Sequence, residues 1–201
     1  RRVVAGDVGG TKTLLRCVEA SGQILAEQRF DSAEFRTFDD LLASFLVLCP
    51  GTIDSACFAV AGPVFGTHAE LTNLSWLVDA SRLATRFDIP RVSLINDFYA
   101  IALGMPFLAE SDLLSLNRGT RDRTSPMAVL GAGTGLGEAM VTFHPTGGWG
   151  VVPGEGGHAD FAPQDEEQTR LLLALQREYR GHVSWERLLS NWPFTSPSAL
   201  P

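Results

Sequence analysis

The sequence has 201 residues, of which 45% are apolar and 19% charged, so it can form a real core and sits at the border between one and two domains. The formal net charge of −7 argues against a nucleic-acid partner, because phosphate binding relies on basic surfaces that release counterions. No apolar run reaches the ~20 residues that span a bilayer, and no signal peptide is visible, so we expect a cytoplasmic protein with no membrane partner. The three cysteines, Cys17, Cys49 and Cys57, have no zinc-site spacing, and we expect buried free thiols in a reducing compartment.

The first motif lies near the start of the chain, where residues 3–18 read as a strand, a tight turn and a second strand. Asp7 ends the first strand, and Gly9 and Gly10 permit backbone angles that other residues resist. Their N–H groups can form an anion-binding nest, to which Thr11 adds a hydroxyl group. An ordinary Gly-Gly hairpin explains the two glycines alone. The acid, the glycines and the threonine together favour a site for phosphate and metal, although no Walker loop is present.

The next stretch is predicted to extend this sheet and to add a helix. Residues 23–30 read as a third antiparallel strand, and residues 38–48 place apolar side chains at helical spacing. Asp39 and Asp40 fall in the first turn of that helix, where they favour its dipole, and we give them no catalytic role.

Two further elements precede the central motif. Residues 55–61 are apolar throughout, which is typical of a central strand buried on both faces. Residues 64–71 fit a hairpin around Gly66, and Asp79 is a suitable N-cap for a helix over residues 80–87.

Asp97 ends the next buried strand, over residues 92–95, and a helix follows from Phe98. Functional groups of α/β proteins gather at the carboxyl ends of strands, so Asp97 is a candidate working carboxylate. Asp97 is also a good residue for simply capping the helix. The two glycine-rich turns elsewhere in the chain favour the functional role.

The second half repeats the opening layout. Residues 120–124 read as an exposed loop, and we place a domain boundary there, giving domains 1–120 and 121–201. Residues 127–143 again read as a strand, a Gly/Thr-rich turn over 131–137 and a return strand, an internal repeat of the first motif. Because a strand follows this turn, it is not the dinucleotide fingerprint, which opens a helix.

A third glycine-rich stretch carries an acid and an imidazole. After a turn at residues 147–150, Glu155 and His158 flank two glycines, so the backbone can hold both side chains close to a small polar ligand. A flexible loop with incidental polar residues is the alternative, and one His with one Glu is too few ligands for a metal site. Helices are predicted over residues 166–180 and 185–189, the second of which carries Glu186.

These features together describe phosphoryl transfer to an alcohol. Two Gly/Thr turns can hold a polyphosphate, an acid at a strand end can take a proton, and the third stretch can hold a polyhydroxy compound. In such reactions positioning and charge neutralisation supply most of the catalysis.

Five motifs in this order resemble the bacterial glucokinase family of the hexokinase/actin-like superfamily, over residues 3 to about 190. They are Gly6-Asp7-Val8-Gly9-Gly10-Thr11, Thr72-Asn73-x-x-Trp76, Ile95-Asn96-Asp97-Phe98, residues 131–137 and residues 153–163. The resemblance implies an α/β protein with the actin-like/hexokinase (ribonuclease H-like) fold. Residues 1–120 would then be a complete small domain with the first phosphate loop and the catalytic Asp. Residues 121–201 would be part of a large domain with the second phosphate loop and the sugar-binding loop.

The resemblance also implies an ATP:hexose phosphotransferase that uses ATP and Mg²⁺ to make glucose 6-phosphate, the first step of glycolysis. Asp97 would be the general base for the sugar 6-hydroxyl, and Asp7 would lie near Mg²⁺. The sugar-binding positions would be Asn96, Asp97, Glu155, His158 and Glu186. The ATP-binding positions would be Gly6, Asp7, Gly9, Gly10, Thr11, Gly133, Thr134 and Gly135.

Two departures from the family leave alternatives open. Lys12, the only lysine, stands where relatives often have Asn, and it either contacts phosphate or points to solvent. The sequence also lacks the last part of a typical relative, with its adenosine-binding turn, so we expect exposed apolar faces on the partial domain. A sugar-binding remnant without activity and a related sugar or N-acetylsugar kinase are therefore alternatives, and a homodimer stays open.

Overall fold

The computed structural model describes residues 1–71, 74–117, 119–120, 122, 124–133 and 135–190. The chain forms two compact units, Arg1–Ala100 and Ile101–Pro201. The division into domains at residues 120 and 121 stays a prediction. In the described part of the chain no helix is both long and apolar enough to cross a bilayer.

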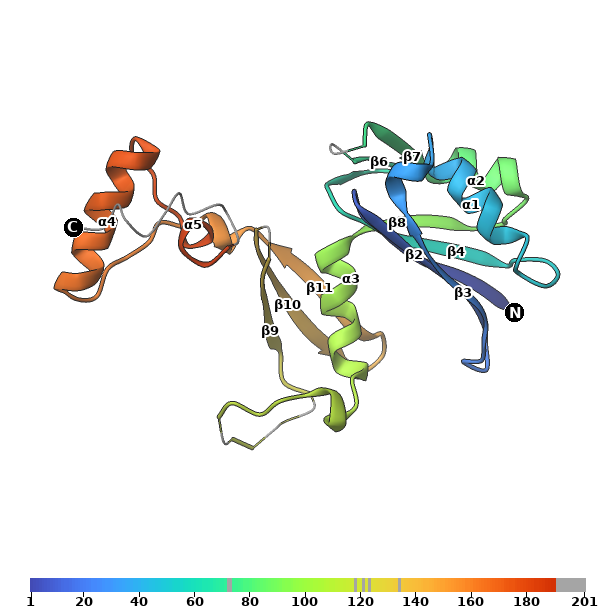
Figure 1. Cartoon of the computed structure of the whole chain (residues 1–201). Helices are drawn as coiled ribbons and strands as arrows, with labels where there is room; N and C mark the ends of the chain where they lie inside the picture. The colour runs from blue at the N-terminus through green and yellow to red at the C-terminus, as the bar shows by residue number, and fades with distance from the viewer. Residues whose placement is uncertain (72–73, 118, 121, 123, 134, 191–201) are drawn as a thin grey trace. The chain divides into compact units, whose positions relative to one another are not determined.

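The first unit is built on a five-stranded mixed sheet (Figure 1) with the strand order β3-β2-β1-β4-β8. The first three strands form an antiparallel meander, and β4 and β8 run parallel to β1. The bounds agree with the predicted strands: β1 is Arg2–Val8, β2 Lys12–Glu19, β3 Ile24–Asp31, β4 Ser55–Val60 and β8 Val92–Asn96. The parallel strands β1, β4 and β8 therefore end at one edge, where the central motif lies.

Two helices and a small second sheet complete this unit. α1 (Phe38–Leu46) begins after Thr37, whose side chain accepts a hydrogen bond from the Asp40 N–H. α2 (Ala80–Phe87) is capped by Asp79 as predicted, because that carboxylate accepts from the N–H groups of Ser81 and Arg82. The small antiparallel sheet contains β5 (Val64–Phe65), β6 (His68–Leu71) and β7 (Trp76–Asp79), and the 3-10 helix η1 spans Ser32–Glu34.

The core of the first unit lies against one face of the five-stranded sheet. Phe38 of α1 and Phe58 of β4 meet edge to face with ring centroids 5.0 Å apart, and both are buried. The prediction that β4 is buried on both faces is wrong. Ala56, Phe58 and Val60 are buried, whereas the alternate residues are partly exposed.

Asp39 plays a role that the sequence pattern did not show. Its carboxylate is 4% exposed and bridges α1 to α2, with Oδ1 2.8 Å from Arg82 Nη2 and Oδ2 3.0 Å from Arg86 Nη1. Asp39 is thus a buried, doubly paired link between two helices, not only a first-turn acid that favours the dipole.

The second unit repeats the meander of the first. Its three-stranded antiparallel sheet has the order β11-β10-β9, which matches β3-β2-β1 and agrees with the predicted internal repeat. The strands are β9 (Met127–Ala132), β10 (Leu136–His144) and β11 (Gly148–Gly154). The sequence predicted only a turn at residues 147–150, so β11 was missed.

Helices precede and follow this sheet along the chain. α3 (Asp97–Gly104) follows β8, and α4 (Glu166–Tyr179) and α5 (Trp185–Leu189) agree with prediction. Phe161, Leu175 and Val183 form a small core beside α4. The 3-10 helices are η2 (Met105–Phe107), η3 (Glu110–Asp112) and η4 (Gly156–His158).

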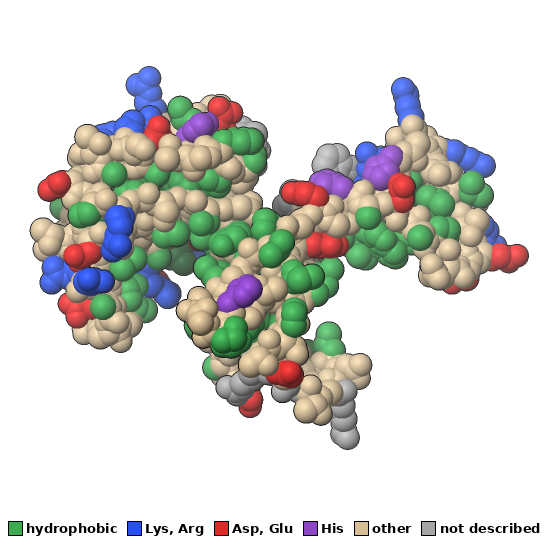
Figure 2. Space-filling model, turned by 180° about the vertical axis from the view of Figure 1, so that it is seen from behind, with side chains coloured by type: hydrophobic (Ala, Val, Ile, Leu, Met, Phe, Trp, Pro, Cys, Tyr) green, Lys and Arg blue, Asp and Glu red, His purple; other side chains and the backbone are tan. Residues whose placement is uncertain are grey.

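Apolar side chains reach the surface of the second sheet, as expected for a partial domain. Met140 and Val152 pair across β10 and β11 and are 52% and 56% exposed, and Leu130 of β9 is 66% exposed. Hydrophobic side chains are correspondingly visible on the surface in Figure 2.

The cysteines are free thiols, of which Cys17 is buried and the other two are partly exposed. Burial, followed by a hydrogen bond with Cys17, raises the pKa of Cys49 to about 12, so this thiol stays protonated at neutral pH.

We predict that Asp39→Ala lowers the free energy of unfolding by about 1–3 kcal/mol, because α1 and α2 lose their buried hydrogen-bonded link. The control is Glu27→Ala, which removes the exposed Arg16–Glu27 pair and should cost about 0–1 kcal/mol. Urea unfolding of both variants measures the difference, and equal losses would contradict a structural role for Asp39.

Candidate active site

The predicted residues of the first unit meet at the carboxyl ends of its parallel strands. Asp7 of β1 is in register with Ala59 of β4, which is in register with Ile95 of β8. Asn96 ends β8 and Asp97 begins α3. The fold thus brings Asp7, Asn96 and Asp97 to one edge of the sheet, as the sequence predicted.

Asn96, and not Asp97, caps α3. The Tyr99 N–H donates to Asn96 Oδ1 over 3.1 Å, which is the usual capping geometry across three residues. The Asn96 Nδ2 group donates to the Gly62 carbonyl at 3.2 Å and to Asp97 Oδ1 at 3.0 Å. One amide side chain therefore ends the strand, starts the helix and holds the neighbouring carboxylate.

This arrangement leaves one oxygen of Asp97 open. Asp97 Oδ1 accepts from the Asn96 amide and from the Phe98 N–H at 2.8 Å. Asp97 Oδ2 accepts no hydrogen bond within the part of the chain that the structure describes. A half-buried carboxylate with one fixed and one open oxygen can accept a proton from a bound hydroxyl group.

The pKa of Asp7 is raised above its ordinary value. Partial desolvation by the surrounding strands is the largest cause, the negative charge of Asp97 adds to it, and Arg29 of β3 lowers the pKa in opposition. Asp7 and Asp97 therefore form a pair of like charges that repel each other in the folded protein.

The turn after Asp7 is held from behind by Ser32 of η1. The Ser32 hydroxyl donates to the Gly9 carbonyl at 2.8 Å and lies 3.0 Å from the Thr13 hydroxyl, and the Ser32 N–H donates to the Thr11 carbonyl at 3.0 Å. Gly9 also donates its N–H to the Lys12 carbonyl at 3.1 Å. Ser32 thus engages the carbonyls of Gly9 and Thr11, and the turn itself engages that of Lys12. Sequence reasoning missed Ser32, because nothing in its neighbourhood marks it as buried.

The glycines of this turn have different reasons to be small. A Cβ atom on Gly9 would lie 2.9 Å from the Lys12 carbonyl oxygen, too close for any other residue. Gly6 faces Leu15 and Phe58 of the core, with a Cβ distance of 2.6 Å to Leu15. The predicted part of Gly6, Gly10 and Thr11 in ATP binding stays a prediction, and Lys12 is exposed.

The second turn, between β9 and β10, is held by Glu186 of α5. The Leu136 N–H donates to Glu186 Oε2 at 2.9 Å, and a Cβ atom on Gly135 would lie 2.7 Å from the same oxygen. Gly135 must therefore be small for the carboxylate to reach the turn. The Gly133 N–H donates to the Gly135 carbonyl at 2.8 Å. Thr134, and Thr72 and Asn73 of the family motif, lie outside the described residues.

Three predicted sugar-binding residues come together in the second unit. His158 Nε2 lies 3.5 Å from Glu155 Oε2, and His158 Nδ1 lies 3.8 Å from Glu186 Oε1. The Glu155 side chain is 89% exposed and that of His158 61% exposed, whereas that of Glu186 is only 29% exposed. Glu155 and His158 thus offer hydrogen-bonding groups to solvent, whereas Glu186 lies partly buried in the cluster.

The site formed by Asp7, Asn96 and Asp97 could hold a magnesium ion only together with a ligand that supplies phosphate oxygens. The described residues contain no cluster of three or more His, Cys, Asp or Glu side chains that could enclose a metal. Mg²⁺, however, commonly binds through one or two carboxylates together with phosphate oxygens and water. The repulsion between Asp7 and Asp97 is what a cation at Asp7 would relieve, so the residues present fit that mode of binding.

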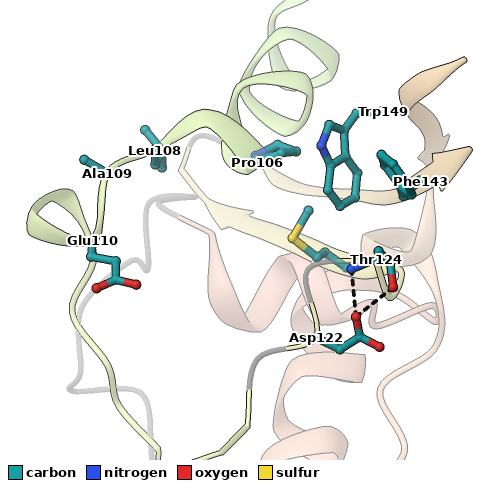
Figure 3. A pocket seen from close by; sticks show the side chains of 9 residues that line it. Pro106, Leu108, Ala109, Glu110, Asp122, Thr124, Phe143 and Trp149 are labelled. Carbon is teal, nitrogen blue, oxygen red and sulfur yellow. Dashed lines mark hydrogen bonds between the residues drawn. The ribbon is translucent and has the colours of Figure 1, made fainter. Parts of the chain in front are cut away.

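A separate cavity of about 510 Å³ lies in the second unit (Figure 3). Apolar side chains, among them Met127, Phe143 and Trp149, line it together with Glu110 and Asp122. Hydrogen bonds from Thr124 and Ser125 lower the pKa of Asp122 to about 2. No predicted site residue lines this cavity, so the sequence motifs do not account for it.

Comparison with known proteins adds three findings. The family model described as Glucokinase matches residues 4–192. A glucokinase from Trichormus variabilis is 42% identical over 195 residues, covering 94% of this chain and 57% of the relative. The chain therefore spans less than two thirds of the length of such relatives.

Solved structures agree with the family match. The crystal structure of a glucokinase from an Antarctic psychrotroph has a TM-score of 0.83 at 30% identity, over 94% of this chain and 60% of that one. The glucokinase from Balamuthia mandrillaris in complex with glucose has a TM-score of 0.70 at 25% identity, over 94% and 59%. The predicted α/β class and actin-like/hexokinase fold are confirmed.

We predict that Asp7→Asn raises stability at neutral pH, because it removes one charge of a repelling pair. The folded state binds the Asp7 proton more tightly than the unfolded state, so native stability falls as the pH rises from the ordinary aspartate range through the raised pKa. The advantage of Asp7→Asn should therefore shrink on acidification. Urea midpoints from pH 3 to pH 7 measure it.

Asp54 is the control of opposite sign, because the Arg2 N–H lowers its pKa. Asp54→Asn should lower stability at neutral pH and lose this effect in acid. An Asp7→Asn variant that is less stable than the wild type at pH 7 would contradict the repulsion.

Proposed function

The chain belongs to the glucokinase family, and from this premise we propose that the protein transfers the γ-phosphoryl group of ATP to the 6-hydroxyl of glucose. The observation that supports this proposal most is the Asn96–Asp97 arrangement, a carboxylate with one fixed and one open oxygen at the carboxyl ends of parallel strands. Its geometry suits a general base.

In the proposed reaction Asp97 Oδ2 accepts the proton of the sugar hydroxyl. The hydroxyl oxygen then forms a bond to the γ-phosphorus while the bond from phosphorus to the ADP oxygen breaks. Asn96 keeps the carboxylate pointed at the hydroxyl, because its amide holds Oδ1 and its own position is fixed by Gly62 and Tyr99. The base therefore does not need to reorient when the sugar arrives.

Glu155, His158 and Glu186 are proposed to hydrogen-bond the sugar hydroxyls. Two carboxylates accept from hydroxyl groups, and the imidazole can donate or accept. A site built from such groups rejects analogues that lack a hydroxyl, because a charged group is then left without its partner. The spacing of 3.5 and 3.8 Å around His158 is wide enough for a ligand to compete for these contacts.

The glycine-rich turns are the proposed nucleotide-binding elements, with Gly6, Asp7, Gly9, Gly10 and Thr11 in the first and Gly133, Thr134 and Gly135 in the second. Asp7 would hold Mg²⁺ together with phosphate oxygens. The ion would supply neutralisation of phosphate charge. Action in the cytoplasm is part of the same proposal.

A second candidate function is sugar binding without turnover by this 201-residue chain. It is favoured by the length comparison, since the chain spans 57% of a glucokinase relative. Calorimetric titration with glucose and then with ATP and Mg²⁺ separates the two. Binding of both with heat of turnover supports the kinase, glucose binding alone supports the second candidate, and binding of neither contradicts both.

We predict that Asp97→Asn lowers turnover by about 10²–10⁴-fold, the usual contribution of a general base, while the glucose Kd changes little. A coupled assay for ADP and a glucose titration measure the two quantities. Asp88→Asn is the control, because Asp88 is exposed and its left-handed backbone, with φ of 52°, tolerates Asn. Turnover like that of the control would remove Asp97 as the base.

We predict that Glu155→Gln weakens glucose binding about tenfold or more, because a charged acceptor is replaced by a neutral one. Glu167→Gln, an exposed change in the first turn of α4, should leave the Kd unaltered. Equal affinities for the two variants would place the sugar site elsewhere.

A further inference from the structure

Three of the predicted sugar-binding residues lie on two segments that are joined by a short backbone bridge. Glu155 and His158 belong to the glycine-rich loop, and Glu186 belongs to α5. Asp160 and Ser184 form an isolated antiparallel bridge between these segments. The Phe161 N–H donates to the Val183 carbonyl at 2.8 Å, and the Trp185 N–H donates to the Ala159 carbonyl at 3.1 Å.

His182 also joins the two segments, through its side chain. Its Nδ1 lies 2.6 Å from Asp160 Oδ1, and its Nε2 lies 3.1 Å from the His158 carbonyl oxygen. Its own carbonyl accepts from Arg187 Nη1 at 2.7 Å. The guanidinium of Arg187 in turn lies 4.2 Å from the centre of the Tyr179 ring, so both sides of His182 are held.

Both ring contacts of His182 end on acceptors. A carboxylate and a backbone carbonyl can only accept, and a neutral imidazole has a single N–H to donate. Whichever ring nitrogen carries the proton, the ring lies within hydrogen-bonding distance of both acceptors, so it joins Asp160 to the His158 backbone. Asp160 contacts the ring itself, and Arg187 contacts the backbone carbonyl of His182. His158 contributes its backbone carbonyl to the ring.

We propose that Asp160 and His182 are positioning residues for the sugar site: through the two contacts of the His182 ring they hold the His158 backbone against the segment that carries Glu186. This inference rests on the proposed function, because it assigns sugar binding to Glu155, His158 and Glu186. Neither residue of the pair touches the sugar. They set the distance between the side chains that do.

The size of the effect follows from exposure. The Asp160 side chain is 82% exposed and that of His182 54% exposed, and pairs of this kind contribute modestly, so we expect about a two- to fivefold loss of glucose affinity in His182→Ala. Global stability should change little.

The first experiment needs no sugar. The chain has four histidines, so its spectrum labelled with ¹⁵N at histidine is simple to assign with His→Ala variants. We expect the ring resonances of His182 to shift in Asp160→Asn, because the contact at Nδ1 loses its carboxylate. Amide hydrogen exchange at Phe161 and Trp185 should accelerate in His182→Ala. His144→Ala, at the far end of β10, is the matched control.

The second experiment is glucose titration of the same variants of the 201-residue chain. His182→Gln keeps one donor and should recover part of the affinity lost in His182→Ala. The double variant Asp160→Asn/His182→Ala should be no weaker than His182→Ala alone, since the two residues act together.

The results separate the two proposals. Exchange and affinity in His182→Ala that match His144→Ala would overturn the positioning role. Faster exchange and lower affinity, with recovery in His182→Gln, would support it. A third outcome is that His182→Ala exchanges faster but the wild type itself binds no glucose. This would support the role of His182 in holding the two segments together and would overturn the proposed function instead.

Discussion

The hydrogen bonds of the Asn96 side-chain amide are the interactions on which the site of Asp7, Asn96 and Asp97 depends. This amide ends β8, caps α3 and fixes one oxygen of Asp97, and each of these tasks uses a different lone pair or N–H. Because the cap is provided by Asn96, the carboxylate next to it is spared that task and keeps an open oxygen. Because hydrogen bonds hold Asn96 and the other oxygen of Asp97, the carboxylate keeps its orientation without help from a ligand, and this suits a catalytic base.

The closeness of Asp97 to Asp7 destabilises the first unit, and other parts of that unit must offset this. Partial desolvation, and then repulsion by Asp97 at the edge of the sheet, raise the pKa of Asp7. The opposing stabilisation comes from the apolar core behind the sheet and from the Asp39 link between α1 and α2. Strain between like charges that a structural role does not require is typical of functional sites. The local conflict therefore supports the proposal that this edge binds a cation and phosphate.

Local patterns in the sequence predicted most of the fold, because period-two strands, the Asp79 cap and the glycine turns are decided within a few residues. The misses depend on tertiary partners. Asp39 is buried only because α2 brings Arg82 and Arg86 to it, and the strand β11 is hidden by glycines that read as a turn. The sequence offered Asp97 as the cap of α3, whereas Asn96 is the residue that caps it. The difference arises because β8 ends one residue later than predicted, at Asn96. Asp160 stood inside the motif of residues 153–163, but only its contact with His182 reveals a role for it.

The first and second glycine-rich turns are held by different kinds of side chain, so they offer different groups to an anion. Ser32, a neutral hydroxyl that follows the neighbouring strand β3, engages the carbonyls of the first turn and leaves other polar groups of that turn for an anion. In the second turn the Leu136 N–H is already occupied by Glu186, a charged residue fifty positions away that also faces His158. An anion at the second turn must use other donors or displace that carboxylate. Because Glu186 is also a proposed sugar-binding residue, occupation of the sugar cluster and the shape of the second turn are linked through one side chain.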